Sequence, residues 1–186
     1  MNDEQIIELY WNRSEDAITQ TDCKYGAYCR KISMNILHNE EDTEECVSDA
    51  YLGVWNAIPP QRPHAFSAFL GKITRNISLH RWQKNRAGKR GGGDTGILLS
   101  ELEECLPARN SFDETLDSRA LGNTLNAFLD TLTSEQRIIF VRRYWYADPI
   151  EEISFRMGLS SSKVTSVLFR LRKKLLIFLQ KEGFSV

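Results

Sequence analysis

Apolar side chains recur every three to four residues along most of the chain, which is the period of an amphipathic α-helix. The alternation of apolar and polar residues that would predict β-strands is not convincing anywhere. Together with capping and helix-breaking residues, the pattern predicts helices at 3–11, 14–37, 42–57, 65–86, 113–130, 134–145, 149–157 and 161–181. The predicted fold is all-α.

The helical pattern is interrupted near the middle of the chain. The stretch NRAGKRGGGDTG, from Asn85 to Gly96, combines basic residues with five glycines and cannot pack. The acidic stretch SELEECLPARNSFDE follows it and is at best partly ordered. We therefore predict two small helical domains, at 1–86 and 113–186, joined by a flexible linker at 87–112.

The last two predicted helices are separated by one glycine and three serines, in IEEISFRMGLSSSKVTSVLFRLRKK. Gly158 suits a turn that requires positive φ, and Ser160 suits the N-cap of the second helix. The apolar positions fall where two short helices that cross steeply would share one core: Ile153, Met157, Leu159, Val164, Val167, Leu168, Leu171 and Leu175. These features favour a helix-turn-helix; a solvated amphipathic helix of a bundle is the alternative.

The outward face of the final helix carries short hydroxyl side chains at its start and cations towards its end. Its residues are Ser161, Ser162, Lys163, Thr165, Ser166, Arg170, Arg172, Lys173 and Lys174. Small polar groups suit base edges in the DNA major groove, and cations suit the flanking phosphates. The pattern predicts a DNA-reading helix.

The segment DTEECVSDAYLGVWNAIPP predicts a helix with two different faces. Its apolar stripe comprises Val47, Ala50, Tyr51, Val54, Trp55 and Ile58. The opposite face holds Glu45, Ser48, Asp49, Leu52 and Asn56. A leucine among carboxylates suggests a contact with a partner protein, although a single exposed leucine is also common on ordinary surfaces.

A proline-stiffened loop then leads into a basic helix, in PPQRPHAFSAFLGKITRNISLHRWQKNRAGKR. Phe66, Phe69, Leu70, Ile73 and Ile77 form its expected core stripe, so the first two aromatic residues are assigned to the core. Lys72, Arg75, Asn76, Arg81 and Lys84 lie largely off this stripe. Cations interleaved with aromatic residues are typical of surfaces that bind single-stranded nucleic acid.

The net charge of −1 hides an uneven distribution. Residues 1–61 carry −8, 62–90 carry +8, 91–130 carry −6 and 131–186 carry +5. Two basic blocks, each preceded by an acidic one, predict two DNA-facing surfaces, joined by a segment that either mimics nucleic acid or meets a basic partner. An acidic linker of this kind would suit a basic channel in such a partner.

Several classes of function find no support in the sequence. No apolar run approaches the ~20 residues of a membrane span, and the N-terminus lacks the features of a signal peptide, so we expect a cytoplasmic protein. Cys23, Cys29, Cys46 and Cys105 show no metal-binding spacing and are expected to be reduced thiols. Without a phosphate loop, metal cluster or nucleophile–base pair, we expect no enzyme, no catalytic residue, no cofactor and no small-molecule substrate.

Three stretches together resemble the extracytoplasmic-function (ECF) group of bacterial RNA polymerase sigma factors. They are DTEECVSDAYLGVW, FSAFLGKITRNIS and LTSEQRIIFVRRYWYADPIEEISFRMGLSSSKVTSVLFRLRKKL, and the resemblance covers nearly the whole chain. It implies a first domain that binds the polymerase clamp helices and melts the −10 element, and a helix-turn-helix domain that binds the −35 element and the polymerase flap. It also implies an inhibitory anti-sigma factor, often membrane-anchored, as a further partner.

The resemblance assigns roles to individual residues. It places Glu45, Asp49, Leu52 and Asn56 on the clamp contact. It places Arg62, His64, Lys72, Arg75, Asn76 and Arg81 on −10 DNA, with residues 61–66 forming a loop that captures an extruded base. It places Ser161, Ser162, Lys163, Thr165, Ser166, Arg170, Lys173 and Lys174 on −35 DNA. The sequence departs from the usual family pattern at Gly71, at His80 and at Asp148–Pro149.

A conventional helix-turn-helix regulator is the main rival interpretation. Such a protein normally reads two half-sites as a dimer, and the acidic helix and basic loop of the first domain would then have no role. The sequence therefore predicts a transcription initiation factor that acts with polymerase core.

Overall fold

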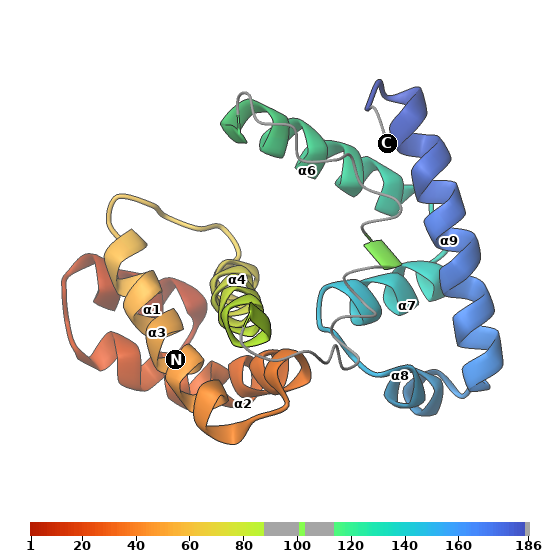
Figure 1. The fold of residues 1–186 in the computed structure, drawn as a ribbon. Coiled ribbons are helices and arrows are strands. Elements are labelled where there is room, and N and C mark those ends of the chain that lie inside the picture. Colours follow the sequence, from red (N-terminus) through yellow and green to blue (C-terminus); the bar gives the residue numbers. More distant parts are fainter. Residues whose placement is uncertain (88–100, 103–113, 185–186) are drawn as a thin grey trace. The chain divides into compact units, whose positions relative to one another are not determined.

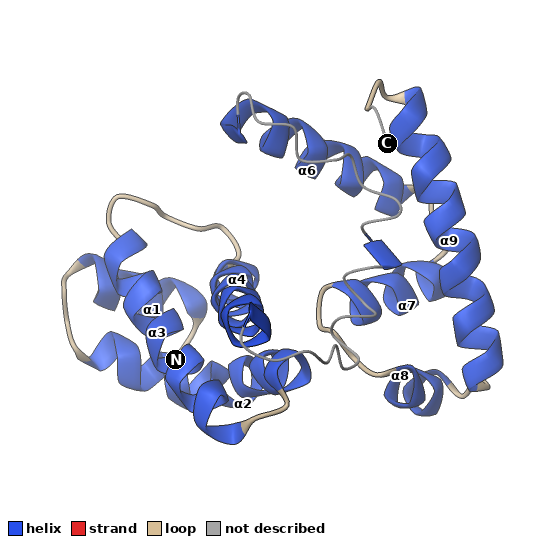
Figure 2. Ribbon diagram, viewed as in Figure 1, coloured by secondary structure: helices blue, strands red, loops and turns tan. Residues whose placement is uncertain are grey.

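The computed structural model describes residues 1–87, 101–102 and 114–184 (Figure 1). The helices are α1 (Asp3–Trp11), α2 (Asp16–Leu37), α3 (Glu40–Ala57), α4 (Phe66–Ala87), α6 (Glu114–Asp130), α7 (Ser134–Tyr144), α8 (Ile150–Met157) and α9 (Ser161–Lys181). Within these ranges all regular structure is helical, which confirms the all-α prediction (Figure 2). None of the described helices has the length and apolar character needed to cross a membrane.

The chain forms two compact units, Met1–Gly91 and Gly92–Val186. Most of the predicted linker at 87–112 lies outside the described residues, including Cys105 and the acidic stretch that we expect to suit a basic channel.

In the first unit, α2, α3 and α4 pack against one another, and α1 packs mainly on α2. The apolar stripes predicted for α3 and α4 supply much of this core. Its fully buried residues include Ile6, Tyr10, Cys29, Val54, Phe66 and Leu70. The prediction that Phe66 belongs to the core is confirmed, because its side chain has no exposed surface.

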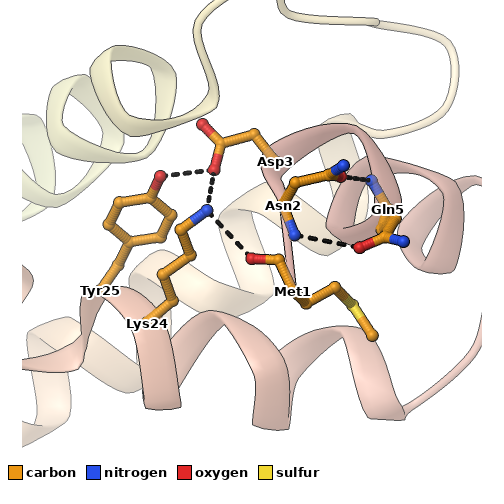
Figure 3. Close-up of polar contacts among 6 residues, drawn as sticks. All are labelled: Met1, Asn2, Asp3, Gln5, Lys24 and Tyr25. Carbon is orange, nitrogen blue, oxygen red and sulfur yellow. Dashed lines mark hydrogen bonds and ion pairs between the residues drawn. The ribbon is translucent and has the colours of Figure 1, made fainter.

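The N-terminal end of α1 is fixed to α2 by polar contacts (Figure 3). Asn2 and Gln5 form a capping box that starts α1. The Asp3 carboxylate accepts hydrogen bonds from Lys24 Nζ at 2.6 Å and from the Tyr25 hydroxyl at 2.5 Å. Burial and the neighbouring Asp3 carboxylate raise the pKa of Tyr25 to about 12, which favours the protonated hydroxyl that donates to Asp3.

Gly71 allows α4 to approach α2 closely. A Cβ atom at this position would lie 2.3 Å from the hydroxyl oxygen of Tyr28 and 3.0 Å from its ring carbon Cζ. The glycine is fully covered and helical, so it serves packing rather than an unusual backbone conformation. This explains why a residue that weakens helices stands inside the basic helix.

Gly71→Ala is expected to lower the melting temperature by several degrees, although alanine favours helices by about 1 kcal/mol over glycine. Forcing a methyl group into a filled space costs about 1–3 kcal/mol, which leaves a net loss of up to about 2 kcal/mol after that gain. Thermal unfolding followed by circular dichroism measures the change. Gly122→Ala in α6 is the matched control, because a Cβ atom there meets nothing within 4 Å, and it should be neutral or stabilising. A Gly71→Ala protein as stable as the wild type would contradict the tight contact.

In the second unit, α7, α8 and α9 pack together and α6 lies against α9. Phe128 of α6 packs against Phe140 and Phe178, with ring centroids 5.8 and 5.7 Å apart. Ile153, Val164, Leu168, Leu171, Leu175 and Leu179 complete the buried core. The apolar spacing seen in the sequence therefore does bring α8 and α9 around one core.

The connection between α7 and α8 is held by a buried carboxylate. Asp148 has no exposed side-chain surface and accepts a hydrogen bond from Arg142 at 2.8 Å. Its backbone carbonyl accepts one from Arg143 at 3.3 Å. Pro149 then precedes the first residue of α8. The unusual Asp148–Pro149 pair thus fixes the entry into the helix-turn-helix.

Candidate nucleic-acid interface

The turn between α8 and α9 has the geometry that the sequence predicted. Gly158 adopts φ 62°, and the Leu159 amide donates to the Ser154 carbonyl at 3.0 Å. The Ser160 hydroxyl caps α9 by accepting from the Lys163 amide at 3.2 Å. Ser154 is buried against the start of α9, where its hydroxyl lies 3.2 Å from that of Ser161. The two helices therefore form a helix-turn-helix.

The face of α9 predicted to read DNA is open to solvent. All eight residues assigned to −35 DNA are exposed: Ser161, Ser162, Lys163, Thr165, Ser166, Arg170, Lys173 and Lys174. Several of these side chains are held by local contacts. Arg170 donates to the Ser166 carbonyl at 3.2 Å, Lys173 lies over the Phe169 ring at 4.6 Å, and Lys174 donates to the Thr131 carbonyl at 3.3 Å. The face therefore combines hydroxyl groups with cations, some of which are held in place by contacts within the protein.

The start of α7 adds to this face, which sequence reasoning missed. A shallow groove is lined by Thr133, Glu135 and Gln136 together with Lys163, Arg170 and Lys174. Glu135 lies 4.0 Å from Lys163. The capping box formed by Thr133 and Gln136 positions this end of α7. The TSEQ motif that forms the box was visible in the sequence, but its position beside α9 depends on tertiary packing.

The prediction that Arg172 faces outward is wrong. Its side chain is only 16% exposed, and its guanidinium donates to the Tyr144 hydroxyl at 2.9 Å and lies 3.3 Å from Glu101. Glu101 also accepts from the Tyr144 hydroxyl at 3.0 Å and lies 3.7 Å from the buried Arg143. A carboxylate from the predicted linker thus holds Arg172 in the second unit, which no local sequence pattern indicated.

In the first unit, the outward face of α3 carries the four residues assigned to a protein partner. Glu45, Asp49, Leu52 and Asn56 are all exposed, and Leu52 exposes 55% of its surface. Cys46, Val47, Ala50, Tyr51 and Val54 fill the opposite face and fix the rotation of the helix. The result is an acidic surface with one apolar side chain near its centre.

Arg81 of α4 lies against the acidic start of this same helix. It forms ion pairs with Asp42, at 3.3 Å, and with Glu45. The hydrogen bond from Arg81 lowers the pKa of Glu45, which keeps the carboxylate ionised. Sequence reasoning assigned Arg81 to DNA and Glu45 to a protein partner. The structure pairs them with each other.

The other residues assigned to −10 DNA differ in accessibility. Lys72, Asn76 and His64 are exposed, whereas Arg75 is half-buried and its burial lowers its pKa. Arg62, in the loop before α4, is exposed but pairs with Glu8 of α1. Arg62, His64, Lys72 and Asn76 are therefore the exposed members of this set.

The described cysteines are free thiols. Cys29 and Cys46 are buried, and burial raises the pKa of both thiols, which disfavours the reactive thiolate. Cys23 is exposed.

Comparison with known proteins matches the two units to two regions of the same protein family. Sigma-70 region 2 matches residues 24–88, and sigma-70 region 4 matches residues 123–175. An ECF RNA polymerase sigma factor, SigE of Mycolicibacterium smegmatis, is 28% identical over 155 residues. This match covers 82% of the present chain and 58% of SigE, so the chain spans little more than half the length of that relative.

A solved structure of CnrH in complex with the cytosolic domain of CnrY is also similar. The match is 19% identical, covers 97% of this chain and 99% of the matched chain of that structure, and aligns with a TM-score of 0.44.

Proposed function

Because the chain belongs to the sigma-70 family, in its extracytoplasmic-function group, we propose that it binds RNA polymerase core and directs it to promoters. In this role, the first unit recognises and helps to open the −10 element, and the second recognises the −35 element. The observation that carries the proposal is the presence of two different surfaces in one chain. One is the exposed polar and cationic face of α9, and the other is the acidic face of α3 with Leu52 at its centre.

The face of α3 suits the polymerase. Glu45, Asp49 and Asn56 can pair with cations or amides of a partner, while Leu52 supplies the apolar contact that such interfaces place near their centre. In this proposal the partner surface is the clamp helices, and the helix-turn-helix unit contacts the flap.

The basic helix and the preceding loop suit an opened −10 element. Lys72, Asn76 and Arg75 lie along α4, and Arg62 and His64 lie in the loop before it. Opening about ten base pairs costs on the order of 14 kcal/mol, whereas capturing each base returns only ~1 to 3 kcal/mol. The polymerase must supply the remainder, so the isolated chain should not melt DNA.

Three further statements follow from the family assignment as proposals. The protein has no enzymatic activity of its own and acts by binding. It works in the cytoplasm, where polymerase core meets the chromosome. An anti-sigma factor, in some systems membrane-anchored, holds it inactive by covering polymerase-binding surfaces.

The direct test is transcription by polymerase core with and without this protein on genomic DNA of its source. Sequencing of the transcript 5′ ends should reveal start sites that require the protein and share −35 and −10 motifs. Gel filtration should show the protein co-eluting with core. Start sites identical to those of core alone, or a dimer that binds palindromic duplexes without polymerase, would instead favour the conventional regulator.

A further inference from the structure

The C-terminal end of α1 lies beside the loop that connects α3 to α4. Tyr10 is fully buried, and its ring packs against Trp55 at 6.1 Å and Phe66 at 5.9 Å. Trp55 lies near the end of α3, and Phe66 is the first residue of α4. Tyr10 therefore fixes α1 against both ends of the loop at 58–65.

Trp11 follows Tyr10 as the last residue of α1 and lies at the surface of this core. It exposes 38% of its surface, whereas Phe66 is fully buried and Trp55 is half-buried under the Arg13 guanidinium at 5.3 Å. The contacts of Asp3 with Lys24 and Tyr25 fix the other end of the same helix (Figure 3). Trp11 is thus an accessible indole on a helix held at both ends.

Arg62 of the loop touches Trp11 directly. Its guanidinium lies over the indole ring, 5.4 Å from the centroid, and it forms an ion pair with Glu8 one turn earlier in α1. Both members of this ion pair are about half exposed, so water weakens their attraction. A DNA phosphate can therefore draw Arg62 away from Glu8 and uncover the face of the indole.

We propose that Trp11 is the stacking surface for an unpaired base of the −10 strand, next to the loop that carries Arg62 and His64. This inference rests on the proposed function. A captured base needs a flat partner for its ring as well as polar groups for its edge. The loop offers polar and cationic groups, and α1 supplies the ring. Trp11 precedes the residues matched by sigma-70 region 2, which begin at Lys24, so that match assigns it no role.

The test compares full-length variants assembled with polymerase core on two probes of a promoter found by transcript sequencing. One probe is fully duplex, and the other is forked, with the −10 non-template strand unpaired. Trp11→Ala should lose roughly 5- to 150-fold in affinity for the forked probe, which is what one base–aromatic stack contributes. Its affinity for core, and for the duplex probe at a temperature at which the −10 element stays closed, should be unchanged. Trp11→Phe should retain most of the forked-probe affinity, because it keeps a ring.

A fluorescent base gives a second measurement, which would not change if Trp11 only stabilised the fold. With 2-aminopurine at the captured position, stacking on the indole should keep emission low, and Trp11→Ala should raise it. Met34→Ala is the control, because it removes a 36% exposed apolar side chain from α2 of the same unit and should leave both readouts unchanged.

Wild-type affinity of Trp11→Ala for the forked probe, or equal losses on both probes, would overturn the inference while leaving the proposed function intact. If the wild-type protein with core bound neither probe, the proposed function itself would fail, and the inference with it.

Discussion

Leu52→Asp and Asp49→Lys are each expected to weaken assembly with polymerase core by about 10- to 100-fold. This corresponds to about 1.4–2.8 kcal/mol, which is typical of truncating a central interface residue. Leu52 is 55% exposed on the acidic face of α3, so a charge placed there would have to be desolvated when the partner binds. Asp49 lies one turn before it on the same face, and reversing its charge would repel a basic partner. Neither side chain contributes to the buried core, so folding should be unaffected.

Binding to core, measured by fluorescence anisotropy or competition, tests this expectation alongside circular dichroism and thermal melting. Met34→Asp is the matched control, because it puts the same charge at a 36% exposed apolar position on α2 of the same unit. It should bind core normally. Wild-type affinity in both α3 variants would show that this face is not the polymerase contact.

Substitutions on α9 are expected to impair DNA binding in two different ways. Removing Lys173 or Lys174 should weaken binding to all duplexes alike and reduce the slope of log K against log salt by about one unit per lost phosphate contact. Changing Lys163 or Ser166 should instead alter which −35 base is preferred, by about 1–3 kcal/mol if a good bidentate contact is involved. The reason is that phosphate contacts carry no sequence information, whereas base contacts do.

Competition binding of the complex with core to a library randomised at the −35 element measures both effects at several salt concentrations. Lys181→Ala is the control, since this exposed cation lies at the end of the same helix, beyond the predicted reading segment. Uniform weakening by all four variants, with no change in base preference, would mean that α9 holds the phosphate backbone and does not read sequence.

Helix positions followed closely from sequence because their signals are local. The last helix was predicted at 161–181 and observed at Ser161–Lys181, since the serine cap and the apolar period both lie within it. The N-terminal helix was likewise predicted at 3–11, where Asn2 and Gln5 form the capping box. The outward face of α3 could also be predicted, because one buried stripe determines the opposite side.

Contacts between distant segments could not be predicted in this way. Arg62 meets Glu8 across 54 residues, and Tyr144 meets Glu101 across 43. Counting charges along the chain identifies a basic block but does not tell which cations have an acidic neighbour in space. The close approach of Tyr28 to Gly71 is a similar case. The sequence shows the glycine but does not show that the Tyr28 ring lies against it.

Under the proposed function, the ion pair between Arg81 and Glu45 links the binding of polymerase to the binding of promoter DNA. Arg81 cannot pair fully with Glu45 and with a DNA phosphate at once. If polymerase engages Glu45, Arg81 keeps only its ion pair with Asp42 and can turn more readily to the promoter, and a promoter that engages Arg81 releases Glu45 towards polymerase. Such linkage is reciprocal, so each ligand must tighten the binding of the other by the same factor. In the protein without polymerase, carboxylates of the same unit would neutralise Arg81. Chromosomal DNA would therefore bind the free protein less tightly than it binds the protein assembled with polymerase.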